Sequence, residues 1–191
     1  MAPAGADPRS AAHGLLLALA GTLTPSPSLR HDPVGRPQVP GLAVSVSYTR
    51  HLIAVAASPA GPLGVDVEEV YPREIRGLAD RWFDPAERDW MAAQPDELRA
   101  FLHLWTAKEA VGKALGTGLR NAGLRRRMPL GGGTVESAPG LVVTHVPWEG
   151  VVLAIAARAV LTQVVVTAHD ETASWSDVMS RTDSPVVVPA S

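Results

Sequence analysis

The sequence predicts an α+β fold made of two similar halves, each a helix plus an antiparallel hairpin, related by a pseudo-twofold axis. Two similar alternating segments carry this prediction, residues 42–57 (LAVSVSYTRHLIAVAA) and 141–157 (LVVTHVPWEGVVLAIAA), which lie about one hundred residues apart. Helical segments around His13 and His103 precede them at a similar separation. The alternative is that hairpins rich in Val and Ala look alike by composition alone.

The length and composition limit the number of domains. The chain has 191 residues, of which 46% are hydrophobic, and this suits one domain or two tightly joined half-domains. We expect an abbreviated N-terminal half over residues 1–62 and a C-terminal half over 63–170. Residues 171–191 lack sustained periodicity and are expected to be a surface-packed or mobile tail. A monomer is expected.

The N-terminal segment predicts a helix that begins near Ser10 and ends at Gly21, before a Pro-Ser-Pro breaker. The apolar run at residues 14–23 also has the form of a secretion signal. However, Asp7 accompanies Arg9 before it, so a basic leading region is lacking. No apolar run approaches the length of a membrane span, so we expect a cytoplasmic protein with no membrane partner.

Three strands follow a linker rich in Pro and Gly. Residues 42–47 and 52–57 predict a hairpin with a short polar turn, and residues 63–68 predict a third strand. Because side chains alternate between the two faces of a strand, Asp66 and Glu68 are predicted to share one face.

Two helices and a second hairpin complete the predicted elements. Residues 84–87 (DPAE) have the form of a capping box with Pro at the first helical position, so a helix should run to about residue 93. A longer helix is predicted over residues 96–115, before two glycines. Residues 141–146 and 151–157 predict the second hairpin.

Charge and cysteine content exclude several classes of function. The chain has 17 basic and 19 acidic residues and a net charge of -2, which disfavours nucleic acid or an anionic membrane as the general partner. It has no cysteine, which excludes disulfides, thiolate catalysis and cysteine-ligated metals. The two lysines, Lys108 and Lys113, lie within six residues of each other and indicate a site.

The longer helix carries an apolar stripe that runs into charged residues. The stripe consists of Leu98, Phe101, Leu102 and Trp105. Its continuation in steps of four reaches Glu109 and Lys113, which are thereby predicted to face inward, where a charge needs a partner, a metal or a ligand. The alternative is an ordinary helical ion pair between residues four apart.

Together the charged residues outline a site for phosphoryl transfer. Asp66, Glu68 and Glu109 are oxygen ligands suited to Mg²⁺, which keeps open positions for phosphate oxygens. Lys108 and Lys113 supply positive charge for a phosphate ester beside the metal. The alternative for the two strand carboxylates is a solvated sheet edge.

At this point several motifs resemble the signature of the 4'-phosphopantetheinyl transferases in both order and spacing. They are GVDVE at 64–68, WF at 82–83 with Glu87, WTAKEA at 105–110 with Lys113, and GTGL at 116–119. GRP at 35–37 and SVSYT at 45–49 resemble two further motifs, typical of the larger, pseudodimeric surfactin-activating branch. The resemblance implies the α+β fold of that family.

The resemblance implies a transferase. It implies transfer of phosphopantetheine from coenzyme A to a serine of an acyl or peptidyl carrier protein, with release of 3',5'-bisphosphoadenosine. This is holo-[acyl-carrier-protein] synthase activity, which serves fatty acid, polyketide or nonribosomal peptide biosynthesis. It also implies Mg²⁺ as the cofactor, with Mn²⁺ as the alternative ion.

The resemblance also implies roles for single residues. Asp66, Glu68 and Glu109 would bind the metal, Glu109 would help to deprotonate the serine, and Lys113 would steady the pyrophosphate and the leaving group. The implied coenzyme A contacts are Arg36, Ser47, Tyr48 and Lys108. The family commonly has histidine at the position of Tyr48, and a phenol brings no positive charge, so His51 or Arg50 is expected to compensate.

The expected partner docks beside the metal site. Carrier proteins are usually acidic, and Arg73 and Arg76 follow the strand motif with the spacing of one helix face, with Arg81 further on. Two other functions stay open. A degenerate, non-catalytic paralogue would bind carriers without modifying them, and a metal-dependent nuclease would use the arginines at 125–127.

Overall fold

The computed structural model describes residues 8–117, 123–158, 163–166 and 186–189. The chain divides into two units, Met1–Ala159 and Val160–Ser191. Within the larger unit, the boundary expected at residues 62 and 63 falls between two separate sheets. A mixed α+β architecture with antiparallel sheets is confirmed, whereas the pseudo-twofold relation between halves stays a prediction.

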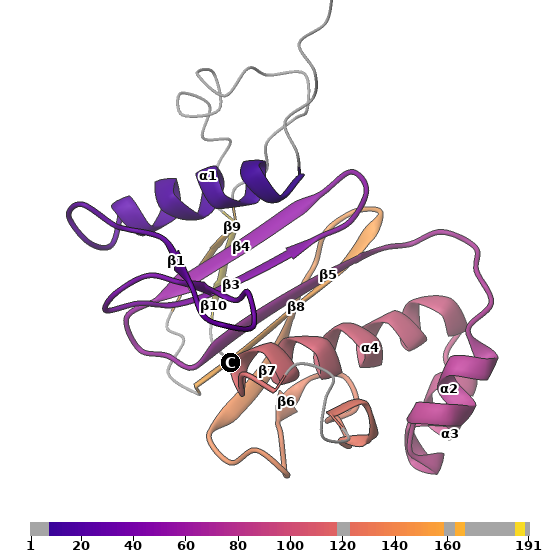
Figure 1. The fold of residues 1–191 in the computed structure, drawn as a ribbon. Coiled ribbons are helices and arrows are strands. Elements are labelled where there is room, and N and C mark those ends of the chain that lie inside the picture. The colour runs from indigo at the N-terminus through magenta and orange to yellow at the C-terminus, as the bar shows by residue number, and fades with distance from the viewer. Residues whose placement is uncertain (1–7, 118–122, 159–162, 167–185, 190–191) are drawn as a thin grey trace, which may run out of the picture. The chain divides into compact units, whose positions relative to one another are not determined.

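A four-stranded antiparallel sheet forms the centre of the larger unit (Figure 1). Its order is β5 (Leu63–Glu69), β8 (Val151–Arg158), β7 (Leu141–Val146) and β6 (Gly133–Thr134). Helix α4 (Glu97–Ala114) packs on one face, and the main core lies between this helix and the sheet. The predicted third strand, long helix and second hairpin are thus confirmed within a residue or two.

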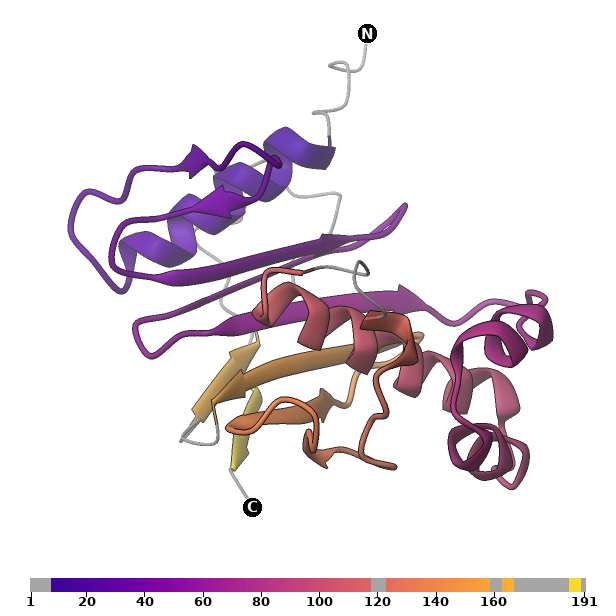
Figure 2. The ribbon, with the colours of Figure 1, turned by 60° about the horizontal axis from the view of Figure 1, so that its bottom comes forward.

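A second layer of the same unit contains the first predicted hairpin, β3 (Ala43–Tyr48) with β4 (Ile53–Ser58). Helix α1 (Pro8–Gly21) packs across this hairpin, with Leu16 fully buried (Figure 1). The short strands β1 (Arg30–His31) and β2 (Pro37–Gln38) pair in the connection between helix and hairpin. Strand β3 lies beside β5, as both ribbon views show (Figure 2).

Two short helices, α2 (Arg76–Trp82) and α3 (Pro85–Ala92), connect β5 to α4. The capping box predicted for α3 is confirmed, since the Asp84 side chain accepts a hydrogen bond from Ala86 N and the Glu87 side chain accepts one from Asp84 N. A 3-10 turn, η1 (Gly123–Arg125), follows α4.

The smaller unit contains β9 (Gln163–Val166), which pairs antiparallel with β10 (Val186–Pro189). Four residues of the expected tail therefore form a strand, and residues 171–185 and 190–191 lie outside the described part of the chain. Among the described helices, none has both the length and the apolar character required to cross a bilayer.

Candidate active site

Strand β5 presents Asp66 and Glu68 on the face that helix α4 covers. In the antiparallel register, Asp66 lies opposite Ala154 and Glu68 lies opposite Val152. Directly opposed residues share a face, and both β8 residues belong to the core under α4. Asp66 is buried and Glu68 is half-buried. The prediction that the two carboxylates share one face is therefore confirmed, and this face is the one that α4 covers.

Gly64 permits α4 to approach β5 closely. A Cβ atom at this position would lie 1.9 Å from the carbonyl oxygen of Ala110, which is far too close for any side chain. The glycine of the strand motif therefore sets the distance between the two elements that carry the charged groups.

On α4, Glu109 and Lys113 lie at the margin of the buried face. Both are half-buried, whereas Leu104 and Val111 on the neighbouring row of the helix are fully buried. Lys113 does not pair with Glu109 one turn away. Its Nζ donates to Asp66 Oδ1 at 2.8 Å and to the Val65 carbonyl oxygen at 3.0 Å. The lysine thus joins α4 to β5 at the acidic motif.

Asp66 has one satisfied and one unsatisfied oxygen. Oδ1 accepts hydrogen bonds from Lys113 and from Ser47 Oγ, the latter at 2.8 Å. Oδ2 is buried, and no group among the described residues donates to it. Burial raises the pKa of Asp66 above its ordinary value, although Lys113 and Ser47 act in the opposite direction. The site therefore retains an unused acceptor.

Glu109 lies in the field of the β5 carboxylates. Burial, followed by the charge of Asp66, raises the pKa of Glu109 to about 7, and the charge of Glu68 adds to the effect. Lys113 opposes the shift. Three carboxylates share this region with two basic groups, Lys113 and Arg73, and the charges of Asp66 and Glu68 disfavour ionisation of Glu109.

The donor chemistry of these residues fits a hard divalent cation, because carboxylate oxygens are its preferred ligands and one Asp66 oxygen is unused. The side chains are not arranged around a single point, however. Within the described ranges, no three His, Cys, Asp or Glu side chains are placed as ligands of one ion. Lys113 occupies one Asp66 oxygen, and Arg73 Nη2 donates to Glu68 Oε2 at 2.9 Å. Each of these two basic groups is thus paired with one oxygen of its carboxylate.

Lys108, one of the expected coenzyme A contacts, has its side chain inside the protein. Its ammonium group is completely buried and forms an ion pair with Glu87, at 2.7 and 2.8 Å to the two carboxylate oxygens. The Arg126 carbonyl oxygen accepts a third hydrogen bond from it, and the Phe83 ring lies 5.0 Å away. Glu87 also accepts from Met128 N. The pair fastens α3 and the segment after α4 to α4 itself, so Lys108 has a structural role here.

The other three predicted coenzyme A contacts lie in different surroundings. Ser47 is buried against Asp66, while the neighbouring Tyr48 is 54% exposed. Arg36 pairs with Asp32 at 2.8 Å and donates to the Gly116 carbonyl oxygen at 2.7 Å, just past the end of α4. Arg36 thus connects the N-terminal segment to the end of the long helix. Gly118 and Leu119 of the same motif lie outside the described residues.

The docking arginines do not form the expected helix face. Arg73 precedes α2, which begins at Arg76, and it is paired with Glu68. Arg76 is 77% exposed on its side chain and lies 3.8 Å from Glu97. Arg76 is thus the more exposed of the two, and Arg81, in the last turn of α2, is exposed as well.

Sequence reasoning missed a polar cluster at the end of β5. Glu69 accepts hydrogen bonds from Thr49 Oγ1, from His51 N and from His51 Nδ1. These contacts hold the pKa of Glu69 at about 2, with the Thr49 hydrogen bond as the largest cause. The signal in the sequence is the alternation of hydroxyl residues at 45, 47 and 49.

Comparison with known proteins identifies the segment that contains the acidic strand and α4. Residues 62–131 match the sequence model of the 4'-phosphopantetheinyl transferase superfamily. A 4'-phosphopantetheinyl transferase of Bacillus subtilis is 37% identical over 90 residues, which are 44% of this chain and 39% of that protein. HetI of Nostoc sp., also a 4'-phosphopantetheinyl transferase, is 34% identical over 82 residues, 41% of this chain and 35% of HetI.

A third relative extends the match. The 4'-phosphopantetheinyl transferase AcpT of Salmonella typhi is 34% identical over 121 residues, which are 60% of this chain and 62% of AcpT. The chain spans about a third of the length of HetI and less than two thirds of AcpT. The resemblance predicted from the motifs is confirmed for the matched segment: residues 62–131 are similar to the 4'-phosphopantetheinyl transferase superfamily.

Proposed function

We propose that this protein transfers 4'-phosphopantetheine from coenzyme A to a serine of an acyl or peptidyl carrier protein. The observation that carries the proposal is the meeting of Asp66, Glu109 and Lys113 between β5 and α4, with the Lys113 ammonium 2.8 Å from Asp66. The relatives named as 4'-phosphopantetheinyl transferases match over these same motifs.

The reaction forms one bond and breaks one. The serine oxygen of the carrier attacks the β-phosphorus of the coenzyme A pyrophosphate, and its proton passes to a carboxylate oxygen of Glu109. The bond from that phosphorus to the bridging oxygen breaks, and 3',5'-bisphosphoadenosine leaves with the electron pair. Lys113 lies where a positive charge would steady the pyrophosphate and the leaving group.

A divalent cation, Mg²⁺ or alternatively Mn²⁺, would be held by Asp66, Glu68 and Glu109. Bound there, it would neutralise charge on the phosphate oxygens. The unused Asp66 Oδ2 and the mutual repulsion of the carboxylates support this assignment. Ser47 would act by orienting Asp66, and Arg36 and Tyr48 would contact coenzyme A from the N-terminal side of the site.

The carrier would approach over the connection between β5 and α2. Arg76 is the better docking candidate of the two predicted arginines, because Arg73 is already paired with Glu68. An Arg76→Glu variant should raise the carrier Michaelis constant and leave coenzyme A binding intact. Unchanged carrier kinetics would place the docking surface elsewhere.

One experiment separates the three candidate functions. The protein is incubated with coenzyme A, Mg²⁺ and an apo carrier protein, and the carrier is weighed by mass spectrometry. A gain of one phosphopantetheine supports the transferase. Carrier binding without a gain in mass supports the degenerate paralogue, and cleavage of plasmid DNA in a parallel sample supports the nuclease.

A further inference from the structure

Two hydroxyl residues of β3, Ser45 and Ser47, and Thr49 directly after it contact β5 in a regular row, called here the hydroxyl row. Val65 N donates to Ser45 Oγ at 3.0 Å, and Val67 N donates to Ser47 Oγ at 3.4 Å. Thr49 Oγ1 contacts Glu69. Each contact joins residues twenty positions apart, so β3 runs parallel to β5 in constant register. Side chains on β3 therefore serve as partners for β5 where backbone carbonyls would serve in an ordinary sheet.

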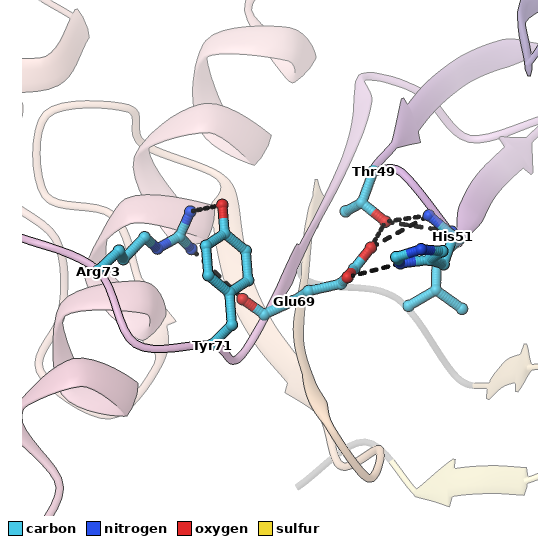
Figure 3. Close-up of polar contacts among 6 residues, drawn as sticks. Thr49, His51, Glu69, Tyr71 and Arg73 are labelled. Carbon is cyan, nitrogen blue, oxygen red and sulfur yellow. Dashed lines mark hydrogen bonds and ion pairs between the residues drawn. The ribbon is translucent and has the colours of Figure 1, made fainter.

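The third contact of the row differs from the first two. Ser45 and Ser47 are buried and accept from backbone amides, and Ser47 also donates to the buried Asp66 carboxylate, whereas Thr49 meets a carboxylate at the open end of the strand. The Glu69 carboxylate also accepts from His51 N at 3.2 Å and from His51 Nδ1 at 3.0 Å (Figure 3). Since a carboxylate only accepts, the His51 ring donates through Nδ1.

The Glu69 contacts fix the turn between β3 and β4. Thr49 Oγ1 accepts from Leu52 N at 3.1 Å while it contacts Glu69, so one carboxylate and one hydroxyl together organise the four-residue turn. Tyr48 enters this turn with its side chain exposed, directly after Ser47, which holds Asp66. The orientation of the exposed Tyr48 relative to the acidic motif is thereby tied to Glu69.

Glu69 does not belong to the carboxylate group of the active site. It follows Glu68 on the strand, so its side chain leaves the opposite face of β5. In Figure 3 its carboxylate points to Thr49 and His51, whereas Arg73, the partner of Glu68, lies on the other side. Any effect of Glu69 on coenzyme A must therefore pass through the turn.

We propose that Glu69 is a positioning residue that preorders the turn of residues 49–52 for coenzyme A. This inference rests on the proposed function, because it names coenzyme A as the ligand of the adjacent Tyr48. A turn that is ordered before binding costs the ligand less conformational entropy than a turn that must be ordered on binding. Removal of Glu69 should weaken ground-state binding of coenzyme A and leave the chemical step unchanged.

The test compares Glu69→Ala and Glu69→Gln with Glu149→Gln, a matched control in the exposed turn between β7 and β8. Calorimetry with coenzyme A and no carrier should show a Kd about tenfold higher for Glu69→Ala. Glu69→Gln retains one acceptor oxygen and should recover part of the loss. Turnover at saturating coenzyme A should stay within about twofold of wild type for all three variants.

Amide hydrogen exchange provides a readout that does not depend on activity. In Glu69→Gln, the amides of His51 and Leu52 should exchange faster, while that of Val55 within β4 should not change. Thr49→Val keeps the shape of the side chain and should produce smaller increases in the Kd for coenzyme A and in the exchange rates of the turn amides. This second variant tests the proposal even if a Glu69 variant fails to fold.

The possible failures are distinguishable. A wild-type protein that binds no coenzyme A would overturn the proposed function together with this inference. Wild-type affinity in both Glu69→Ala and Thr49→Val would overturn the positioning role alone. A fall in turnover at unchanged Kd would also overturn it, because Glu69 would then act on the chemical step.

Discussion

Strand β5 has two neighbours and is joined to them by different chemistry. On one side, β8 pairs with all seven residues of β5 in an antiparallel backbone ladder. On the other side, β3 reaches β5 through the hydroxyl row. A backbone ladder satisfies amides and carbonyls but places no side chain between the strands. The hydroxyl row satisfies Val65 N and Val67 N and, in addition, directs Ser47 to Asp66.

The two neighbours of β5 therefore have different roles. The ladder to β8 serves mainly stability, and the hydroxyl row also serves the site. The core lies on the ladder side, because helix α4 packs on β8 as well as on β5. The hydroxyl side contains the polar groups that orient Asp66 and the turn after Tyr48. Substitutions on the ladder side should therefore affect mainly folding, and those on the hydroxyl side should affect activity as well.

The largest effect is expected at the acidic motif itself. Asp66→Ala and Glu109→Ala should each reduce phosphopantetheine transfer by about 10²-fold to 10³-fold or more, the scale set by loss of a preorganised electrostatic group. Thermal stability should change little for either variant, because burial opposes ionisation of both carboxyls and raises their pKa values. The measurements are carrier mass spectrometry and thermal unfolding. Normal modification of the carrier by either variant would contradict the assigned site.

The next largest effect is expected on the ladder side, at Gly64. Gly64→Ala places a Cβ atom against the Ala110 carbonyl oxygen and must push α4 away from β5. Overpacking of this kind should lower the free energy of unfolding by about 3 kcal/mol. Urea unfolding measures this change, with Gly77→Ala in α2 as a control whose Cβ atom meets nothing within 4 Å. Equal stability of the two variants would show that α4 adjusts without cost.

A smaller effect is expected from pH, again on the ladder side. The His145 ring lies 4.2 Å from the His103 ring, and its Nε2 is 3.0 Å from the His103 carbonyl oxygen. Burial, followed by the charge of His103, lowers the pKa of His145 to about 4. The unfolded chain takes up this proton near pH 6.5, so stability should be lost as the pH falls from about 6.5 to 4, by about 3 kcal/mol at most.

The measurement for this prediction is urea unfolding of wild type and His145→Gln between pH 7 and pH 4. Glutamine keeps a donor near the His103 carbonyl oxygen but has no proton to gain, so the slope over this range should be shallower in the variant. Parallel profiles for the two proteins would assign the acid sensitivity to other groups, among them His103, whose pKa burial also lowers.

The sequence predicts local features of the chain better than contacts between residues that are far apart in it. Period-two alternation correctly placed Asp66 and Glu68 on one face, because local chain geometry determines which way a strand residue points. The capping box at Asp84 was confirmed for the same reason. By contrast, Lys108 pairs with Glu87, which lies 21 positions away and shows no spacing signal that links it to Lys108. Tertiary packing alone brings these two groups together.

The hydroxyl row falls between these cases. Residues 45, 47 and 49 alternate visibly, but the constant offset of twenty to β5 depends on which strands become neighbours. Local pattern predicts that these hydroxyls share a direction and leaves their partners open. For the same reason the spacing predicts a helix face for Arg73, whereas contacts with Glu68 and Tyr71 hold it in the connection before α2.

The smallest effects should come from the two buried serines, which differ in a way that tests the comparison directly. Ser45→Ala and Ser47→Ala each remove the acceptor of one β5 amide, so each should lower the free energy of unfolding by about 1 to 2 kcal/mol. Only Ser47 also donates to Asp66 Oδ1. Under conditions in which both variants are fully folded, Ser47→Ala should therefore lower transfer activity severalfold. Ser45→Ala, the matched control two residues away, should not. Equal activity of the two folded variants would mean that Lys113 alone suffices to orient Asp66, and that the hydroxyl row contributes to the fold without shaping the site.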